Sequence, residues 1–196
     1  ENFGLCFEDP VDFVLAIDGR DNSRLLVQER YEVLRAMFYH ETHDADAYLD
    51  PPDADTPLFK PISLMLQTAT PLLTGNWQAS SETYETGDLA YGNANPAAPD
   101  YDSLADFIFA GDYVELKLPW QLLNFSDPSR MTIHDDYYEN YGVDYITIDT
   151  MYLGLTDGAA QERTPLYPAA LKGWGNTVSY HERLKPSYYI LQKLWQ

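Results

Sequence analysis

A seven-residue segment in which apolar and polar side chains alternate strictly constrains the fold of this chain most. Residues 112–118 read Asp-Tyr-Val-Glu-Leu-Lys-Leu, so Val114, Leu116 and Leu118 occupy one face and the residues between them occupy the other. Side chains alternate across a β-strand, and this pattern therefore predicts a strand with one face in a core and one in solvent. Pro119 cannot continue the ladder and is expected to open a single helical turn.

The rest of the chain predicts further strands and no regular alternation of strands with helices. A turn-rich segment, 19–23, joins the first two strands into a hairpin. Residues 31–39 fit either a helix or a strand, and the tail 180–196 fits either a final strand or a docked helix. The expected strands are residues 12–18, 24–28, 62–73, 76–84 and 145–153.

Strands without intervening helices favour antiparallel sheets over a parallel α/β sheet. We predict an all-β fold, an antiparallel β-sandwich of jelly-roll or immunoglobulin-like type, with long acidic loops and a short C-terminal helix or strand. The loops are residues 40–61, rich in Asp and Pro, and residues 87–99. A length of 196 residues fits one domain, 1–196. The start at Glu1, without Met or an apolar leader, predicts a fragment of a longer chain.

The chain is strongly acidic, with 31 Asp and Glu against 12 Lys and Arg and a net charge of −19. Nucleic acids and anionic membrane surfaces are bound mainly through Lys and Arg, so electrostatic repulsion excludes both as partners. No apolar run approaches the ~20 residues that a membrane-spanning helix needs. The single cysteine, Cys6, permits no internal disulfide, and its neighbours Leu5 and Phe7 favour a small buried side chain over a nucleophile.

Two segments resemble a known group of sandwich modules. The stretch 113–124, Tyr-Val-Glu-Leu-Lys-Leu-Pro-Trp-Gln-Leu-Leu-Asn, is similar to a signature of family 9 carbohydrate-binding modules and DOMON-like domains, in which "glutamate, apolar, x, apolar, Pro-Trp" runs into a short turn. The stretch 13–19, an apolar strand that ends in Asp before a turn, looks like the same group. The resemblance implies an immunoglobulin-like or jelly-roll-like sandwich attached to secreted glycan-active enzymes.

The tail carries a second resemblance. Residues 182–192 contain Lys-Pro-Ser-Tyr-Tyr and are similar to the close of some glycoside hydrolase chains. This implies the C-terminal part of a secreted or surface carbohydrate-active protein. The implied location is extracellular or at the cell surface, and the implied partners are a glycan or polysaccharide and an upstream domain of the same chain.

Sugar binding needs a flat aromatic face against the C–H surface of the ring, together with polar groups for the hydroxyls. Trp174 is the most suggestive candidate, because the glycines on both sides of it leave the indole exposed. Trp120, in the Pro-Trp turn, is instead expected to fill the core. Each loop aromatic also has the alternative of packing beneath its loop. The candidate ligand-binding residues are Trp77, Trp174, Tyr84, Tyr91, Asn93, Asn95 and Tyr101.

Glycoside hydrolysis would require two carboxylates a few ångströms apart. Glu82 with Glu85 and Asp135 with Glu139 are the best-placed pairs, and a solvated charged face is the alternative interpretation of both. No catalytic residue is assigned.

His40 and His43, with Asp44 and Asp46, form a cluster of His and carboxylates, but it lacks the i, i+4 spacing of zinc proteases and reads as a polar loop. No cofactor is expected, with structural calcium as an alternative because Asp-rich loops supply its hard oxygen ligands. The calcium candidates are Asp44, Asp46, Asp50, Asp53, Asp55, Asp18 and Asp21.

The sequence therefore favours a non-catalytic extracellular module that binds carbohydrate. A structural or interaction domain packed on an upstream domain, without a glycan site, remains open as an alternative. A glycoside hydrolase domain that uses paired carboxylates is the second alternative.

Overall fold

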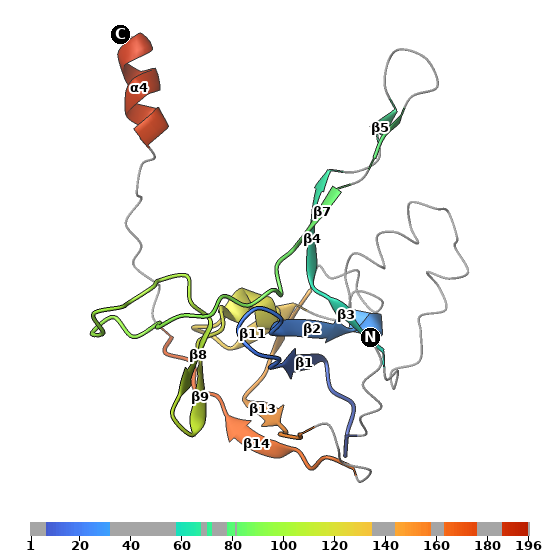
Figure 1. The fold of residues 1–196 in the computed structure, drawn as a ribbon. Coiled ribbons are helices and arrows are strands. Elements are labelled where there is room, and N and C mark those ends of the chain that lie inside the picture. The colour runs from blue at the N-terminus through green and yellow to red at the C-terminus, as the bar shows by residue number, and fades with distance from the viewer. Residues whose placement is uncertain are drawn as a thin grey trace.

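In the described part of the chain, the regular structure of the computed structural model consists mainly of short antiparallel strands (Figure 1). Across these described residues the strands form six sheets of two or three strands. The all-β class with antiparallel sheets is thus confirmed. The structure describes residues 7–31, 58–67, 70–71, 78–80, 82–134, 144–157, 163–175 and 186–195.

The predicted N-terminal hairpin is confirmed by β1 (Phe13–Ala16) and β2 (Arg24–Gln28), which pair in antiparallel register. Its turn is closed by the buried Ser23, whose Oγ donates to the Gly19 carbonyl at 2.8 Å and accepts from the Asp18 amide at 3.0 Å. One side chain thus satisfies two backbone groups that the turn would otherwise leave unpaired.

The prediction of a loop over the whole of residues 40–61 is wrong at its end. β3 (Phe59–Pro61) pairs with β2, opposite residues Leu26 to Gln28, and Phe59 is buried. Pro61 tolerates this place because β3 is an edge strand, where one neighbour suffices and a missing amide hydrogen costs little. Residues 40–57 lie outside the described residues.

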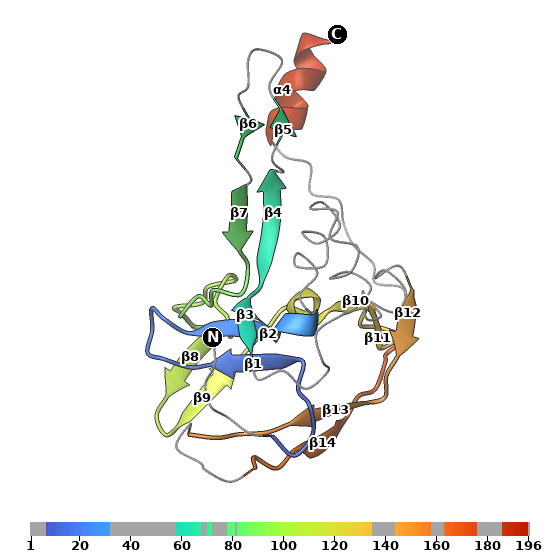
Figure 2. The same ribbon diagram turned by 90° about the vertical axis from the view of Figure 1, so that its right-hand side faces the viewer.

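A long hairpin, which we call the arm, extends from this sheet (Figure 2). It consists of β4 (Ser63–Gln67) paired with β7 (Glu82–Glu85), and of β5 (Thr70–Pro71) paired with β6 (Gln78–Ala79). The strands predicted at 62–73 and 76–84 therefore exist and pair with each other.

The alternating segment forms β9 (Tyr113–Leu116), which pairs with β8 (Phe107–Ala110). The strand is confirmed, but the expectation of one buried face is wrong: Val114 is 40% exposed and Leu116 44%. The physical reason is that β8 and β9 form a two-stranded sheet, whose outer apolar side chains no second sheet covers in the described structure. Leu118, just after the strand, does pack against the core.

The centre of the core is a cluster of Leu25, Leu89 and Phe107, which come from β2, the loop after β7 and β8. η2 (Trp120–Leu123) closes one side of it, as the Pro-Trp segment predicts, and η1 (Glu29–Tyr31) follows β2. Trp120 packs edge-on against the buried Phe125, with ring centroids 4.8 Å apart. Trp120 thus supports a buried aromatic ring, but it is half-buried itself and does not fill the core as expected.

One strand expected at 145–153 is two strands in different sheets. β12 (Tyr145–Thr147) joins β10 (Phe125–Asp127) and β11 (Thr132–His134), whereas β13 (Thr150–Leu153) pairs with β14 (Tyr167–Ala170). Between them the Ile148 amide donates to the Met131 carbonyl and the Asp149 carbonyl accepts from Leu171. These opposed backbone bonds turn the chain from one sheet to the other.

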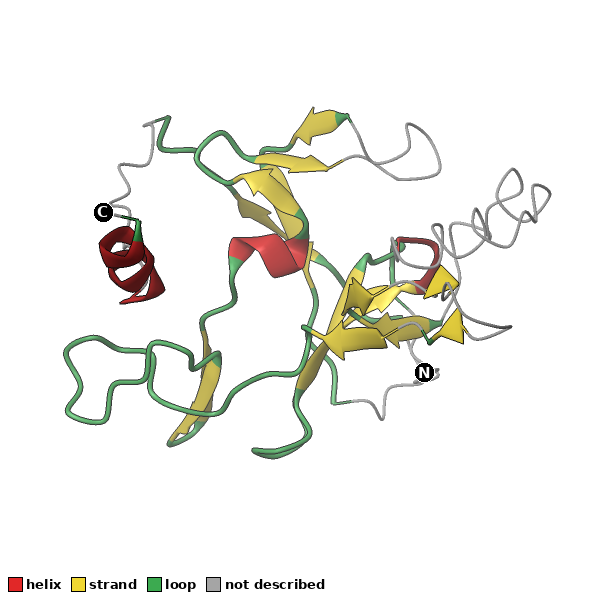
Figure 3. Cartoon of the chain, turned by 90° about the horizontal axis from the view of Figure 1, so that it is seen from above, coloured by secondary structure: helices red, strands yellow, loops and turns green. Residues whose placement is uncertain are grey.

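The tail forms a helix, α4 (Pro186–Leu194), and not a final strand. Seen from above, α4 stands apart from the strands, and its apolar side chains are exposed (Figure 3). The alternative of a docked helix is therefore wrong for this chain on its own. No helix in the described residues combines the length and apolar character that crossing a membrane requires.

Candidate functional site

Four of the predicted ligand-binding residues lie on the loop 87–106, between β7 and β8. Tyr91 is half-buried there, with its ring 5.3 Å from Phe107 and 5.7 Å from Phe109. The Arg20 guanidinium lies 4.4 Å from the centroid of the same ring. Tyr91 thus anchors the loop to the core and to the β1–β2 turn.

The two asparagines shape the same loop. The Asn93 side chain donates to Asp100 at 2.9 Å and accepts from the Asn95 amide, and the Asn95 side-chain oxygen accepts from the Ala97 amide. Such side-chain caps replace a backbone turn. Tyr101 is bridged to Asn93 through the backbone and stays exposed.

Tyr84 and Trp77 are separate from this loop. Tyr84 lies on β7 of the arm, directly opposite Leu64, and is exposed. Trp77 lies outside the described residues. The candidate residues are therefore distributed over the loop, the arm and the segment after β14.

Trp174 has the most defined support of the group. The Gly175 amide donates to the Ser129 carbonyl at 3.0 Å, and a Cβ on Gly173 would lie 2.5 Å from the same carbonyl oxygen. Gly175 also has φ +61°, which favours glycine. Gly173 is thus required by its close approach to the Ser129 carbonyl and Gly175 by its backbone conformation, and Trp174 between them has 45% of its surface exposed.

The support under Trp174 is itself a rigid turn. Asp127 accepts from the Ser129 amide at 3.0 Å and from the Ser129 hydroxyl at 2.6 Å, and it pairs with Arg130 at 3.7 Å. The hydrogen bonds from Ser129, assisted by the charge of Arg130, hold the pKa of the Asp127 carboxyl below its usual value. Ser129 is buried, so the turn presents a fixed surface to Gly173 and Gly175. The Asp-Pro-Ser sequence at 127–129 is a turn signal, but nothing local links it to Trp174.

The carboxylate pair on β7 has the wrong geometry for acid–base work across one bond. Glu82 and Glu85 are three positions apart on a strand and therefore project from opposite faces. Glu85 lies 3.6 Å from Arg24, and its Oε1 is buried without a hydrogen bond. Asp135 and Glu139 lie outside the described residues.

Within the described ranges, no group of three or more His, Cys, Asp or Glu side chains is placed to hold a metal ion. Asp18 and Asp21 are exposed in the β1–β2 turn. The other metal candidates lie outside the described residues, as does Cys6. They are His40, His43, Asp44, Asp46, Asp50, Asp53 and Asp55.

No protein-family model, curated protein or solved structure matches this chain. Function is therefore inferred from the residues and contacts described above.

Proposed function

We propose that this chain is a non-catalytic extracellular module that binds a neutral glycan through Trp174. The observation that carries the proposal is the exposed indole between two glycines that both rest on the Ser129 carbonyl. An indole face offers a large, flat apolar surface for the C–H face of a sugar ring. The resemblance of residues 113–124 to carbohydrate-binding modules supports the same ligand class.

The contacts of Gly173 and Gly175 favour binding because a backbone that is already held in place beside Trp174 loses little freedom when a ligand arrives. Asp127 and Arg130 belong to the supporting turn and are polar groups of the kind that fix sugar hydroxyls. With a net charge of −19, a polyanionic glycan would be repelled. We therefore propose a neutral oligosaccharide or polysaccharide as the ligand.

A panel of soluble neutral glycans tests the proposal by melting temperature and tryptophan fluorescence. At least one glycan is expected to raise the melting temperature of the native chain and to lose this effect with Trp174→Ala. Trp195→Ala, which removes the exposed tryptophan that follows α4, is the matched control and should retain the response. A response unchanged by Trp174→Ala, or no response to any glycan, would overturn the proposal.

The exposed apolar side of β13–β14 favours a second candidate function, an interaction domain packed on an upstream domain. Leu153 and Tyr167 are directly opposite each other on one face of these strands and are exposed, and Leu155 follows at 93% exposure. Tyr152 is exposed on the other face. A two-stranded sheet is marginally stable alone, and contiguous exposed apolar surface marks an interaction site.

Hydrogen exchange on the chain alone and within its full-length protein tests this second candidate. Slower exchange of the β13–β14 amides in the full-length protein is the expected result. Equal exchange in the two forms would rule out an upstream domain on this face.

A further inference from the structure

Two more exposed apolar faces lie on α4 and on the arm. On α4, Ile190, Leu191 and Leu194 are exposed on one side of the helix. The exposed Trp195 directly follows α4, and its amide donates to the Leu191 carbonyl. On the arm, Leu64 and Tyr84 are directly opposite each other on β4 and β7, and both are exposed, as is the neighbouring Leu66.

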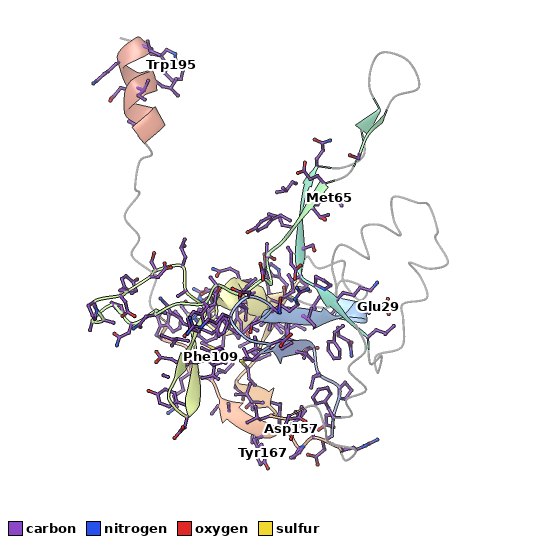
Figure 4. All side chains as sticks on the ribbon, in the orientation of Figure 1. Glu29, Met65, Phe109, Asp157, Tyr167 and Trp195 are labelled. Carbon is purple, nitrogen blue, oxygen red and sulfur yellow. The ribbon has the colours of Figure 1, made fainter. Side chains whose placement is uncertain are left out.

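The two faces are on the same side of the molecule but do not cover each other. Figures 1 and 2 show α4 and the arm rising in the same direction from the body, and Figure 3 shows a separation between them. Figure 4 places Trp195 and Met65 on two distinct projections. Each face is thus open to a partner.

The charges of the two faces are complementary. α4 has no acidic residue and carries Lys193 in its last turn, which is unusual in a chain with 31 acidic residues. The arm strands β4 and β7 contain no base but carry Glu82, which is exposed, and Glu85, which already faces Arg24. A helix without acidic residues can approach this arm where most other segments of the chain would be repelled.

The dimensions of the two faces also agree. Nine helical residues span about 13–14 Å at a rise of 1.5 Å per residue. Five strand residues in β4 span about 16–17 Å. The apolar side of α4 therefore fits within the length of the arm.

We propose that α4 of one copy packs across the β4–β7 face of the arm of a second copy, with Lys193 beside Glu82. A twofold axis makes the contact reciprocal, so one symmetry operation covers both arms and both helices and closes a dimer. An unrelated partner on either face would leave the other bare. The contact uses neither Trp174 nor the β13–β14 face, so it is independent of the two functions proposed above.

Sedimentation equilibrium and light scattering over a range of concentrations test the dimer. The native chain is expected to be dimeric, and Leu194→Glu on α4 or Leu64→Glu on the arm should each raise the dissociation constant at least about tenfold. Leu155→Glu is the matched control, because Leu155 is exposed and lies on neither face. The native chain and the three variants should give the same circular dichroism spectrum, since the substituted side chains are exposed.

A charge exchange tests the orientation. Lys193→Glu should raise the dissociation constant of the dimer about two- to fivefold for each of the two Lys193–Glu82 contacts. Adding Glu82→Lys in the same chain should restore the native dissociation constant. Disulfide trapping of Leu66→Cys with Leu191→Cys, in a Cys6→Ser background, should link two chains. A monomer at all concentrations, equal weakening by Leu155→Glu, or a trap that forms within one chain would each overturn the proposal.

Discussion

The Arg20 guanidinium lies 4.4 Å from the centre of the Tyr91 ring and joins the β1–β2 turn to the loop 87–106. Tyr91 in turn contacts Phe107 and Phe109, so the position of the loop depends on a stack that reaches into the core. Such a contact between a cation and an aromatic ring at the surface contributes about 0.5–1 kcal/mol.

Arg20→Ala is therefore expected to lower the free energy of unfolding by about that amount. Arg20→Lys should retain part of it, because an ammonium also interacts with the ring but does not stack as a plane. Urea denaturation measures both, with Arg163→Ala as a control on an exposed arginine that does not contact Tyr91. Equal stability of Arg20→Ala and the native chain would show that the stack does not hold the loop.

Gly173 provides the second prediction, because a side chain there would strike the Ser129 carbonyl. Gly173→Ala is expected to destabilise the chain by about 2–3 kcal/mol and to shift Trp174 fluorescence. Gly111→Ala is the control: its φ is +65°, but nothing lies within 4 Å of a new Cβ, so it should cost only about 1–2 kcal/mol. Its tryptophan emission should stay unchanged. Native-like emission from Gly173→Ala would contradict the support described for Trp174.

The pKa of Asp127 provides the third prediction. Hydrogen bonds from Ser129 lower this pKa in the folded chain, so the carboxylate stabilises the turn above its unfolded pKa of about 3.9. That contribution to stability is lost as the pH falls through the lowered pKa that Asp127 has in the folded chain. Ser129→Ala should raise the pKa of Asp127 toward the ordinary value, and Asp127→Asn should remove this part of the acid dependence. NMR titration of the carboxyl groups measures the pKa of Asp127 in Ser129→Ala. Urea denaturation between about pH 2 and 6, a range set around the carboxyl pKa, measures the acid dependence of stability in Asp127→Asn. An Asp127 pKa that does not rise in Ser129→Ala would contradict the assigned cause.

Local patterns predicted the elements that local interactions form. The β1–β2 hairpin could be predicted because its turn residues and both strands are adjacent in sequence, and Ser23 closes the turn within a few residues. β3 was missed because it ends a segment, 40–61, whose Asp and Pro content predicts a loop, and only its pairing with β2 at a sheet edge makes Pro61 tolerable in a strand.

Interactions between distant segments account for the remaining differences. Alternation shows that Val114 and Leu116 share a face, but not whether another sheet covers that face. The run 145–153 is continuous in sequence, and only backbone bonds to Met131 and Leu171 divide it. The glycines beside Trp174 correctly indicated an exposed residue, but the contact that requires Gly173, with Ser129, comes from a distant turn.

Asn124 provides the last prediction, because it combines an unusual backbone with a side-chain role. Its φ of 63° ends η2 in the left-handed region, and its side-chain amide donates to the Tyr31 hydroxyl and to the His134 carbonyl. Asn124→Ala removes both bonds and keeps the strain, so it should cost about 2–3 kcal/mol. Asn124→Gly removes the bonds but relieves the strain, and it should therefore be about 1 kcal/mol more stable than Asn124→Ala. Denaturant unfolding of the two variants separates the contribution of the hydrogen bonds from that of the backbone strain. Equal stability would mean that the hydrogen bonds alone, and not the backbone conformation, explain the choice of asparagine at this position.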